Sequence, residues 1–331
     1  MLSMEGIMNT WKLSIKPDSK KGFSAFSKCK DKSLLGLGWH HAYLSKTPSN
    51  LEEAKDLVKG KWKKWPYQLK YLLEDMKADD HVWIHQNGKY YLCKATDTTI
   101  LYGNSIDPDY DSYDLGHARK ATWVVVPEKF VTGSIQRGTI AQRTIQKIKI
   151  TDKEAEFNKF IFDQLLKNPA WEPKIDIDKL EKSLKGIVST ELFSLMSPDD
   201  VEDVVSAYMQ DKGWVLIKST CFRSKPKFEF SMLNKKGEMA HIQVKSGKSP
   251  DPLGPEKYKD YTSSKNLIYL FSTNKKPYPG ISVPDVHTMP QDDLLKWVTN
   301  NLWAITLPLR SRLWIFLNDK NANKANSHGQ N

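Results

Sequence analysis

Residues 227–245 read KFEFSMLNKKGEMAHIQVK, two stretches of alternating apolar and polar residues around the turn signal Asn-Lys-Lys-Gly. Side chains along a strand point alternately to the two faces of a sheet, so this pattern predicts a hairpin with one apolar face. Folding the hairpin about Lys236 places Glu229 opposite Gln243, because each lies seven residues from that point. Paired residues share a face, so we expect both to meet Lys245 on the polar side. The apolar side would comprise Phe228, Phe230, Met232, Ala240, Ile242 and Val244.

The polar side of this hairpin has the chemistry that phosphodiester hydrolysis requires. Mg²⁺ prefers hard oxygen ligands and usually takes only one or two protein carboxylates, with water and phosphate as its other ligands. Glu229 offers a carboxylate, Gln243 a neutral oxygen and Val244 a backbone carbonyl. Lys245 would position or deprotonate the attacking water and offset charge in the transition state. The alternative is a solvated amphipathic hairpin with ordinary surface residues, which this stretch alone does not exclude.

Residues 196–214 have the marks of a helix. Ser197 is placed as an N-cap, Pro198 suits the first helical position, and Gly213 would end the helix. The buried stripe would comprise Val201, Val204, Val205 and Tyr208. Glu202 flanks that stripe, so it can reach a site packed against the sheet.

The order of helix, strand, Glu-bearing strand and Gln-x-Lys strand resembles the PD-(D/E)xK nuclease superfamily, and more narrowly its Mrr-like restriction endonuclease domains. The motifs that carry the resemblance are SPDDVE at 197–202, the pair Gly213-Trp214, Glu229 and QVK at 243–245. They span about residues 190–290. The resemblance implies an α/β (α+β) fold, a mixed sheet flanked by helices.

The same resemblance assigns roles to particular residues. Its catalytic set would be Glu202, Glu229, Gln243 and Lys245, and its metal ligands Glu229, Gln243 and the Val244 carbonyl. The implied cofactor is Mg²⁺ or Mn²⁺. The family's usual second acid is Asp, whereas Glu229 is one methylene longer. Because a carboxylate is kept, we interpret the site as active.

A second short motif next to this site resembles a phosphate-binding loop. Residues 246–249 read SGKS, but the P-loop needs a glycine five residues before Gly247, where Ile242 stands. Three prolines follow instead of a helix: Pro250, Pro252 and Pro255. We therefore expect no nucleotide cofactor.

Composition favours an anionic partner. The 331 residues carry 50 Lys and Arg against 39 Asp and Glu, a formal net charge of +11, which is typical of nucleic-acid binding. The three cysteines, Cys29, Cys93 and Cys221, form neither a zinc pattern nor a disulfide framework, which fits a reducing cytosol. No signal-peptide pattern and no run as long as a membrane helix is present, so we expect a cytoplasmic protein without a membrane partner.

The N-terminal half has a different pattern, which predicts a small mixed α/β barrel over residues 1–135. Residues 81–94 form a strong hairpin signal around Asn87-Gly88, and residues 121–126 read as a strand ended by Pro127. The order resembles the PUA-like superfamily that includes EVE and YTH domains. The matching pieces are Gly38-Trp39 before a helix, Asp79-Asp80-x-Val82 before the hairpin, and the closing strand that begins at Trp123.

Domains of that kind hold a flipped base in an aromatic cage. By position Trp39 would form one wall, His40 could touch the base, and a loop would supply the other wall from Tyr102, Tyr110 or Tyr113. The alternative is that these aromatic residues are ordinary core packing, which is common in small barrels.

The remaining segments complete the organisation. We expect a helical connector over residues 136–190, the nuclease domain over 191–317 and a disordered tail over 318–331. Candidate contacts to the DNA backbone are Arg137, Arg143, Lys147 and Lys248.

Together these patterns predict a DNA endonuclease of the restriction or phage-defence type. It would cut double-stranded DNA after its N-terminal domain recognises a base feature, with a modified base as the leading expectation. One alternative is a non-catalytic reader of modified bases. Another is a sequence-specific restriction enzyme indifferent to modification. Whether the chain forms a homodimer is left open.

Overall fold

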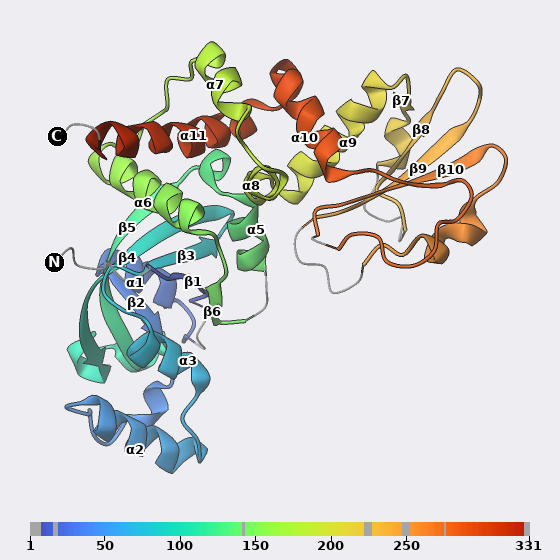
Figure 1. Ribbon diagram of the computed structural model, residues 1–331. Coiled ribbons are helices and arrows are strands. Elements are labelled where there is room, and N and C mark those ends of the chain that lie inside the picture. The colour runs from blue at the N-terminus through green and yellow to red at the C-terminus, as the bar shows by residue number, and fades with distance from the viewer. Residues whose placement is uncertain are drawn as a thin grey trace. The chain divides into compact units, whose positions relative to one another are not determined.

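Figure 1 presents the computed structural model, which describes residues 8–15, 19–140, 143–221, 227–246, 252–274 and 276–327, without the side chains of residues 140 and 318–327. The chain divides into two compact units. The first unit comprises Met1–Glu128 and Gly138–Glu172, and the second comprises Lys129–Arg137 and Pro173–Asn331. Each unit has its own mixed sheet flanked by helices, as the sequence predicts at this level.

The first unit is built on a six-stranded sheet in the order β2-β5-β4-β3-β1-β6. The strands are β1 (Thr10–Leu13), β2 (Leu34–Leu37), β3 (His81–Gln86), β4 (Lys89–Tyr102), β5 (His117–Val126) and β6 (Ile145–Ile148). Its helices are α1 (Ala25–Asp31), α2 (Leu51–Trp62), α3 (Tyr67–Lys70), α4 (Tyr110–Tyr113) and α6 (Asp152–Lys167). Only the β1–β3 pair is parallel among the pairings of the described residues.

The predicted hairpin over residues 81–94 is confirmed. Strands β3 and β4 pair from His81↔Lys94 to Gln86↔Lys89, and the turn residues Asn87 and Gly88 have φ values of 52° and 70°. Both positive angles are those of the two-residue turn that the Asn-Gly signal favours.

The expected closed barrel is wrong for the described residues. Strands β2 and β6 lie at opposite edges of the sheet and do not pair with each other. The edge strand β6 comes from the segment predicted to be a helical connector, and it pairs antiparallel with β1. That segment also contains α6, which lies against β5 in Figure 1 and packs on the first unit.

The second unit is built on a five-stranded sheet in the order β11-β10-β9-β8-β7. The strands are β7 (Val215–Leu216), β8 (Phe230–Leu233), β9 (Met239–Lys245), β10 (Asn266–Ser272) and β11 (Val286–Thr288). The helices are α7 (Ile177–Leu184), α8 (Ser189–Leu195), α9 (Pro198–Asp211), α10 (Gln291–Asn300) and α11 (Leu307–Ser327), while α5 (Gly133–Ile140) contains a boundary between the units. Strands β7, β8 and β9 are antiparallel neighbours, and β9, β10 and β11 are parallel neighbours.

Helix α9 follows its sequence signals. Ser197 accepts a hydrogen bond from the backbone N–H of Asp200, Pro198 is the first helical residue, and Gly213 with φ 89° follows the helix end. Of the predicted stripe, Val201, Val204 and Val205 are buried and Tyr208 is half-buried, and Met209 is buried beside them.

The C-terminal tail differs from expectation as far as it is described. Helix α11 continues to Ser327, well into the stretch predicted to be disordered. Extending an existing helix costs little, since each added residue gains one backbone hydrogen bond. No helix among the described residues is both long enough and apolar enough to span a membrane.

Candidate active site

The register of the β8–β9 hairpin is the one predicted from the sequence. Phe230 pairs with Ile242 and Leu233 with Met239, and the same offset sets Glu229 opposite Gln243. The backbone N–H of Glu229 donates to the carbonyl of Ile242 at 2.8 Å. In the turn, Asn234 Oδ1 accepts from the backbone N–H groups of Lys236 and Glu238.

The two faces of the hairpin differ in one respect from expectation. The apolar face is buried, as predicted, through Phe230, Met232, Ala240, Ile242 and Val244. Phe228 does not join it, because its ring stacks on His241 at 5.1 Å. His241 lies on the opposite face, together with Ile268 and Leu270 of the parallel neighbour β10.

That opposite face is therefore covered as well. Tyr258 of the 3₁₀ helix Pro255–Tyr261 packs with Phe228, Leu253 and Ile268 over it. Gln243 retains only 4% of its exposed surface. The Gln243 amide is therefore shielded from water, whereas the Glu229 side chain remains 31% exposed.

Three polar groups converge at the end of β9. The side-chain amide nitrogen of Gln243 donates to Glu229 Oε1 at 2.8 Å and to the backbone carbonyl of Val244 at 3.1 Å. Lys245 Nζ lies 3.7 Å from the same Glu229 oxygen, and its side chain is 45% exposed. A carboxylate, an amide and a carbonyl therefore surround one point, with an ammonium group at its solvent side.

Helix α9 adds a further group, the carboxyl of Glu202. The pKa of Glu202 is raised to about 7, first because the carboxyl is partly buried and next because the Glu229 carboxylate repels its charge. Asp199 and Asp203 act in the same direction, whereas Lys245 lowers the pKa. The structure thus brings Glu202 within electrostatic range of Glu229 and Lys245, so all four predicted catalytic residues lie in one neighbourhood.

Glu202 is expected to cost stability at neutral pH. Its folded pKa lies above the ordinary value of 4.5, so between pH 4.5 and 7 the folded state binds more protons than the unfolded state. Stability contributed by this group therefore falls as pH rises through that window. Glu202→Gln should raise the free energy of unfolding at pH 8 by about 1–3 kcal/mol and change it little near pH 4.5.

Urea denaturation at the two pH values measures this difference. Glu181→Gln, at an exposed position of α7, removes a charge from the same unit and serves as the control. A Glu202→Gln variant no more stable at pH 8 than the control would show that Glu202 is not held at a charge-repelling site.

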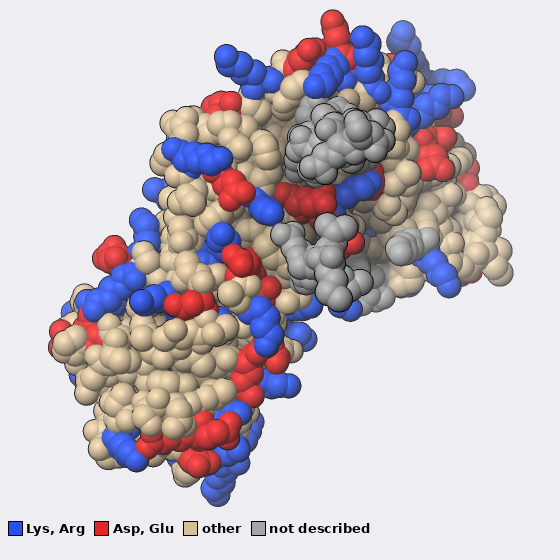
Figure 2. Space-filling model, turned by 60° about the vertical axis from the view of Figure 1, so that its left-hand side comes forward, with Lys and Arg blue, Asp and Glu red and all other residues tan. Residues whose placement is uncertain are grey.

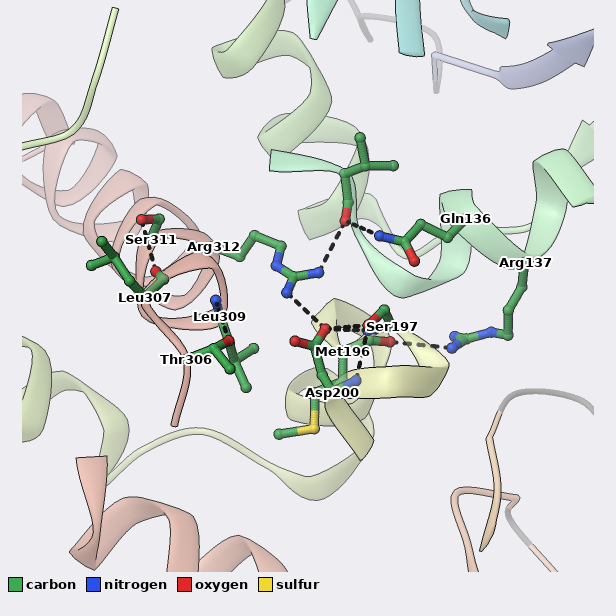
Figure 3. A network of polar contacts seen from close by, with 11 residues as sticks. Gln136, Arg137, Met196, Ser197, Asp200, Thr306, Leu307, Leu309, Ser311 and Arg312 are labelled. Atoms are coloured by element: carbon green, nitrogen blue, oxygen red, sulfur yellow. Dashed lines mark hydrogen bonds and ion pairs between the residues drawn. The ribbon is translucent and has the colours of Figure 1, made fainter. Parts of the chain in front are cut away.

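The position of α9 is fixed by a buried network (Figure 3). Arg312 of α11 donates to Asp200 Oδ2 at 2.7 Å and to the Val131 carbonyl at 3.0 Å. The same Asp200 oxygen accepts from the backbone N–H and hydroxyl of Ser197 at 2.7 and 2.6 Å. Arg312 is 2% exposed. This network holds the N-terminus of α9, where Asp200 lies two residues before Glu202.

Sequence reasoning missed Arg312. It lies in an apolar run, residues 307–317, where the pattern indicates only a buried surface. The signal was present, since an arginine inside such a run needs a buried partner.

A hard divalent cation fits the donor set. The described residues contain no group of three or more His, Cys, Asp and Glu side chains arranged for a metal. The Glu229 carboxylate with the amide oxygen of Gln243 and the Val244 carbonyl matches Mg²⁺, which keeps water ligands and needs few carboxylates. The repulsion between Glu202 and Glu229, seen in the raised pKa of Glu202, is what a cation beside them would relieve.

The predicted DNA-backbone residues are not brought together by one unit. Arg137 belongs to the second unit, where it donates to the Met196 carbonyl at 3.3 Å. Arg143 and Lys147 are exposed residues of the first unit, and Lys248 lies outside the described residues. Basic side chains are interspersed with acidic ones over the face drawn in Figure 2.

The first unit contains a separate pocket of about 390 Å³ beside Trp39. Trp39 and Trp62 line it, together with His40, whose Nδ1 lies 2.5 Å from Asp114 Oδ1. Trp39 has φ 67°, in the left-handed region that a bulky residue rarely adopts. A Cβ at Gly38 would lie 2.6 Å from Asp114 Oδ2, so a larger residue there would displace the carboxylate that pairs with His40.

The pocket differs from the predicted cage in its second wall. None of the three candidate tyrosines lines it. Tyr102 and Tyr110 are buried in the core, where the Tyr110 hydroxyl donates to the Tyr43 carbonyl at 3.1 Å. Tyr113 packs edge-on against Phe23 with ring centroids 5.0 Å apart. Trp62, at the end of α2, takes the place that sequence reasoning gave to them.

Comparison with protein-family models, with curated proteins and with solved structures gave no match. The proposed function therefore rests on the chemistry of the β8–β9 site and of the pocket beside Trp39.

Proposed function

We propose that this chain is a divalent-metal-dependent DNA endonuclease of the PD-(D/E)xK type, close to the Mrr-like branch. The observation that carries the proposal is the convergence of Glu229, Gln243 and the Val244 carbonyl beside Lys245, with Glu202 approaching from α9. In a solvated amphipathic hairpin these polar side chains would face water. Here Gln243 is instead buried against Glu229 and next to apolar residues, and burying a polar group costs free energy.

Each residue of the set has a role in hydrolysis. Glu229, the Gln243 oxygen and the Val244 carbonyl would hold the cation, which supplies Lewis acidity toward the phosphate and lowers the pKa of bound water. Lys245, at the exposed side of the site, binds a non-bridging phosphate oxygen or the attacking water. Glu202, which is partly buried and within electrostatic range of Glu229 and Lys245, is placed to accept the proton of that water. The water oxygen bonds to phosphorus as the bond to one ester oxygen breaks, and that oxygen leaves as an alcohol after taking a proton from solvent.

A substrate panel tests this activity and its range. Supercoiled DNA that is unmodified, methylated or hydroxymethylated would be incubated with the full chain and Mg²⁺, and nicked and linear products counted. We expect cleavage, with a preference for at least one modified substrate. Equal cleavage of all three would favour the modification-indifferent restriction enzyme. Binding without cleavage of any would favour the non-catalytic reader.

The first unit supplies the proposed base recognition, as a PUA-like domain. Its pocket has two tryptophans and a His40–Asp114 pair, which offer stacking surfaces and edge hydrogen bonds to a flipped base. Restriction of foreign DNA that carries modified bases follows as the proposed role.

Trp39→Ala should weaken binding to the preferred modified duplex by about 1–3 kcal/mol, the usual worth of a base–aromatic stack. Salt-sensitive binding to unmodified DNA should remain, because it comes from contacts of Lys and Arg to phosphate. The full chain is required, since a cut at residue 135 would remove β6 from the sheet of the first unit.

Fluorescence anisotropy with matched modified and unmodified duplexes measures both affinities. Trp303→Ala removes a tryptophan that is 76% exposed in the second unit and is the control. If Trp39→Ala and Trp303→Ala bind every duplex alike, Trp39 is a packing residue and not a reader.

A further inference from the structure

The amide of Gln243 occupies the place where a cation would bind. Its nitrogen lies 2.8 Å from Glu229 Oε1 and 3.1 Å from the Val244 carbonyl oxygen. These are two of the three groups proposed as metal ligands, and the third is the oxygen of the same amide.

Electrostatics explains why the nitrogen lies there. A carboxylate and a carbonyl are both acceptors only, so two such oxygens facing one point need a positive partner between them. The NH₂ group of Gln243 is the partial positive charge that bridges them. If the amide oxygen took its place, three acceptors would face one another at a buried position, which is strongly unfavourable without a cation.

Because Gln243 is buried, breaking its hydrogen bonds to admit a cation costs free energy. The side chain is 4% exposed, so water does not readily replace either hydrogen bond. A cation that binds Glu229 and Val244 must displace the NH₂ group, and the amide must turn about its terminal torsion so that its oxygen faces the metal. One buried and one partly buried hydrogen bond are lost when the metal–ligand bonds form.

We propose, on the basis of the proposed function, that Gln243 is a gate that closes the metal site of the free protein. The closed site binds Mg²⁺ or Mn²⁺ weakly. A phosphate of bound DNA adds oxygen ligands and negative charge, which favours the open rotamer together with the cation. Metal loading is thereby coupled to substrate binding.

Replacing the gate with a carboxylate tests this coupling. An ionised carboxylate cannot donate a hydrogen bond, so Gln243→Glu should destabilise the protein in EDTA through repulsion from Glu229. In Mn²⁺ we expect Gln243→Glu to be more stable than the wild type. Its dissociation constant for Mn²⁺ should be lower than that of the wild type by about tenfold or more. Thermal unfolding and titration calorimetry give these values without any assay of activity.

Gln291→Glu is the matched control. The amide nitrogen of Gln291 also bridges two oxygens, the carbonyls of Ser272 and Asn274, at 2.7 and 2.9 Å. This variant makes the same chemical change in the same unit, at an amide that bonds to Ser272 and Asn274 rather than to Glu229 or Val244. It should lower the melting temperature equally in EDTA and in Mn²⁺, with no gain in Mn²⁺ affinity.

The added charge of Gln243→Glu could by itself raise the affinity for Mn²⁺. NMR signals of the side-chain amides in the wild-type protein test the rotation of Gln243 without that charge. With ¹⁵N-labelled glutamine, saturating Mg²⁺ should shift the NH₂ signals of Gln243 and leave those of Gln291 in place. Unmoved Gln243 signals in a Mg²⁺-bound protein, or no reversal of stability in Gln243→Glu, overturn the gate. If the wild type cleaves no DNA, but Gln243→Glu is still the less stable protein in EDTA and the more stable one in Mn²⁺, the proposed function is overturned and the gate is not.

Discussion

Lys245→Ala is expected to lower the rate of DNA cleavage by about 10²–10³-fold or more, the usual cost of removing one group that stabilises transition-state charge. The ammonium group lies 3.7 Å from Glu229 and the side chain is 45% exposed, so its removal leaves no buried charge unpaired. The protein should therefore stay folded and keep most of its affinity for DNA.

Lys236→Ala is the control for this variant, because Lys236 is an exposed lysine in the turn of the same hairpin. Single-turnover cleavage and DNA binding would be measured for both variants beside the wild type. Equal cleavage rates for the two variants would remove Lys245 from the chemistry.

Arg312→Ala is expected to have the largest effect on stability, a loss of about 3–5 kcal/mol, because it leaves the buried Asp200 carboxylate without its cation. The Val131 carbonyl also loses its shorter hydrogen bond and keeps only the one from Gln136 Nε2 at 3.4 Å among the described residues. Asp200→Asn in the same chain should recover part of the loss, since the unpaired charge is then gone.

Chemical denaturation of the single and double variants measures the coupling. Arg310→Ala, two residues away on α11, removes a half-buried arginine that donates to the nearby carbonyls of Ile305 and Trp303, and it should cost much less. If Arg312→Ala costs no more than Arg310→Ala, the buried network does not stabilise the second unit.

The local part of the candidate site can be predicted from the sequence. The turn Asn-Lys-Lys-Gly and the alternation around it determine the register that pairs Phe230 with Ile242, and hence the facing of Glu229 and Gln243. The N-terminus of α9 is likewise predictable from two adjacent residues, Ser197 as the N-cap and Pro198 as the first helical residue. Both predictions depend on interactions a few residues apart.

The rest depends on contacts between distant segments. Phe228 leaves the predicted apolar face because β10 and Tyr258 provide an apolar cover on the other side, and neither is adjacent in sequence. Arg312 and Asp200 are 112 residues apart. No short-range pattern identifies such partners, although a charge in an apolar run indicates that one exists.

The first unit illustrates the same limit. The Asn87-Gly88 hairpin is predictable, whereas the edge strand β6 joins the sheet from beyond the expected domain boundary. The aromatic residues Tyr102 and Tyr110 fit a cage by position in the chain, yet they lie in the core, and Trp62 from α2 lines the pocket.

The central claim is that Glu229, Gln243 and Lys245 form a metal-dependent phosphodiesterase site. It is tested most directly by incubating the full chain with supercoiled DNA, unmodified and modified, in Mg²⁺, in EDTA, and in EDTA followed by excess Mg²⁺. We predict nicked and linear DNA in Mg²⁺, none in EDTA, and recovery of cleavage when Mg²⁺ is restored. Cleavage that persists in EDTA, or its absence on every substrate with either Mg²⁺ or Mn²⁺, would contradict the claim.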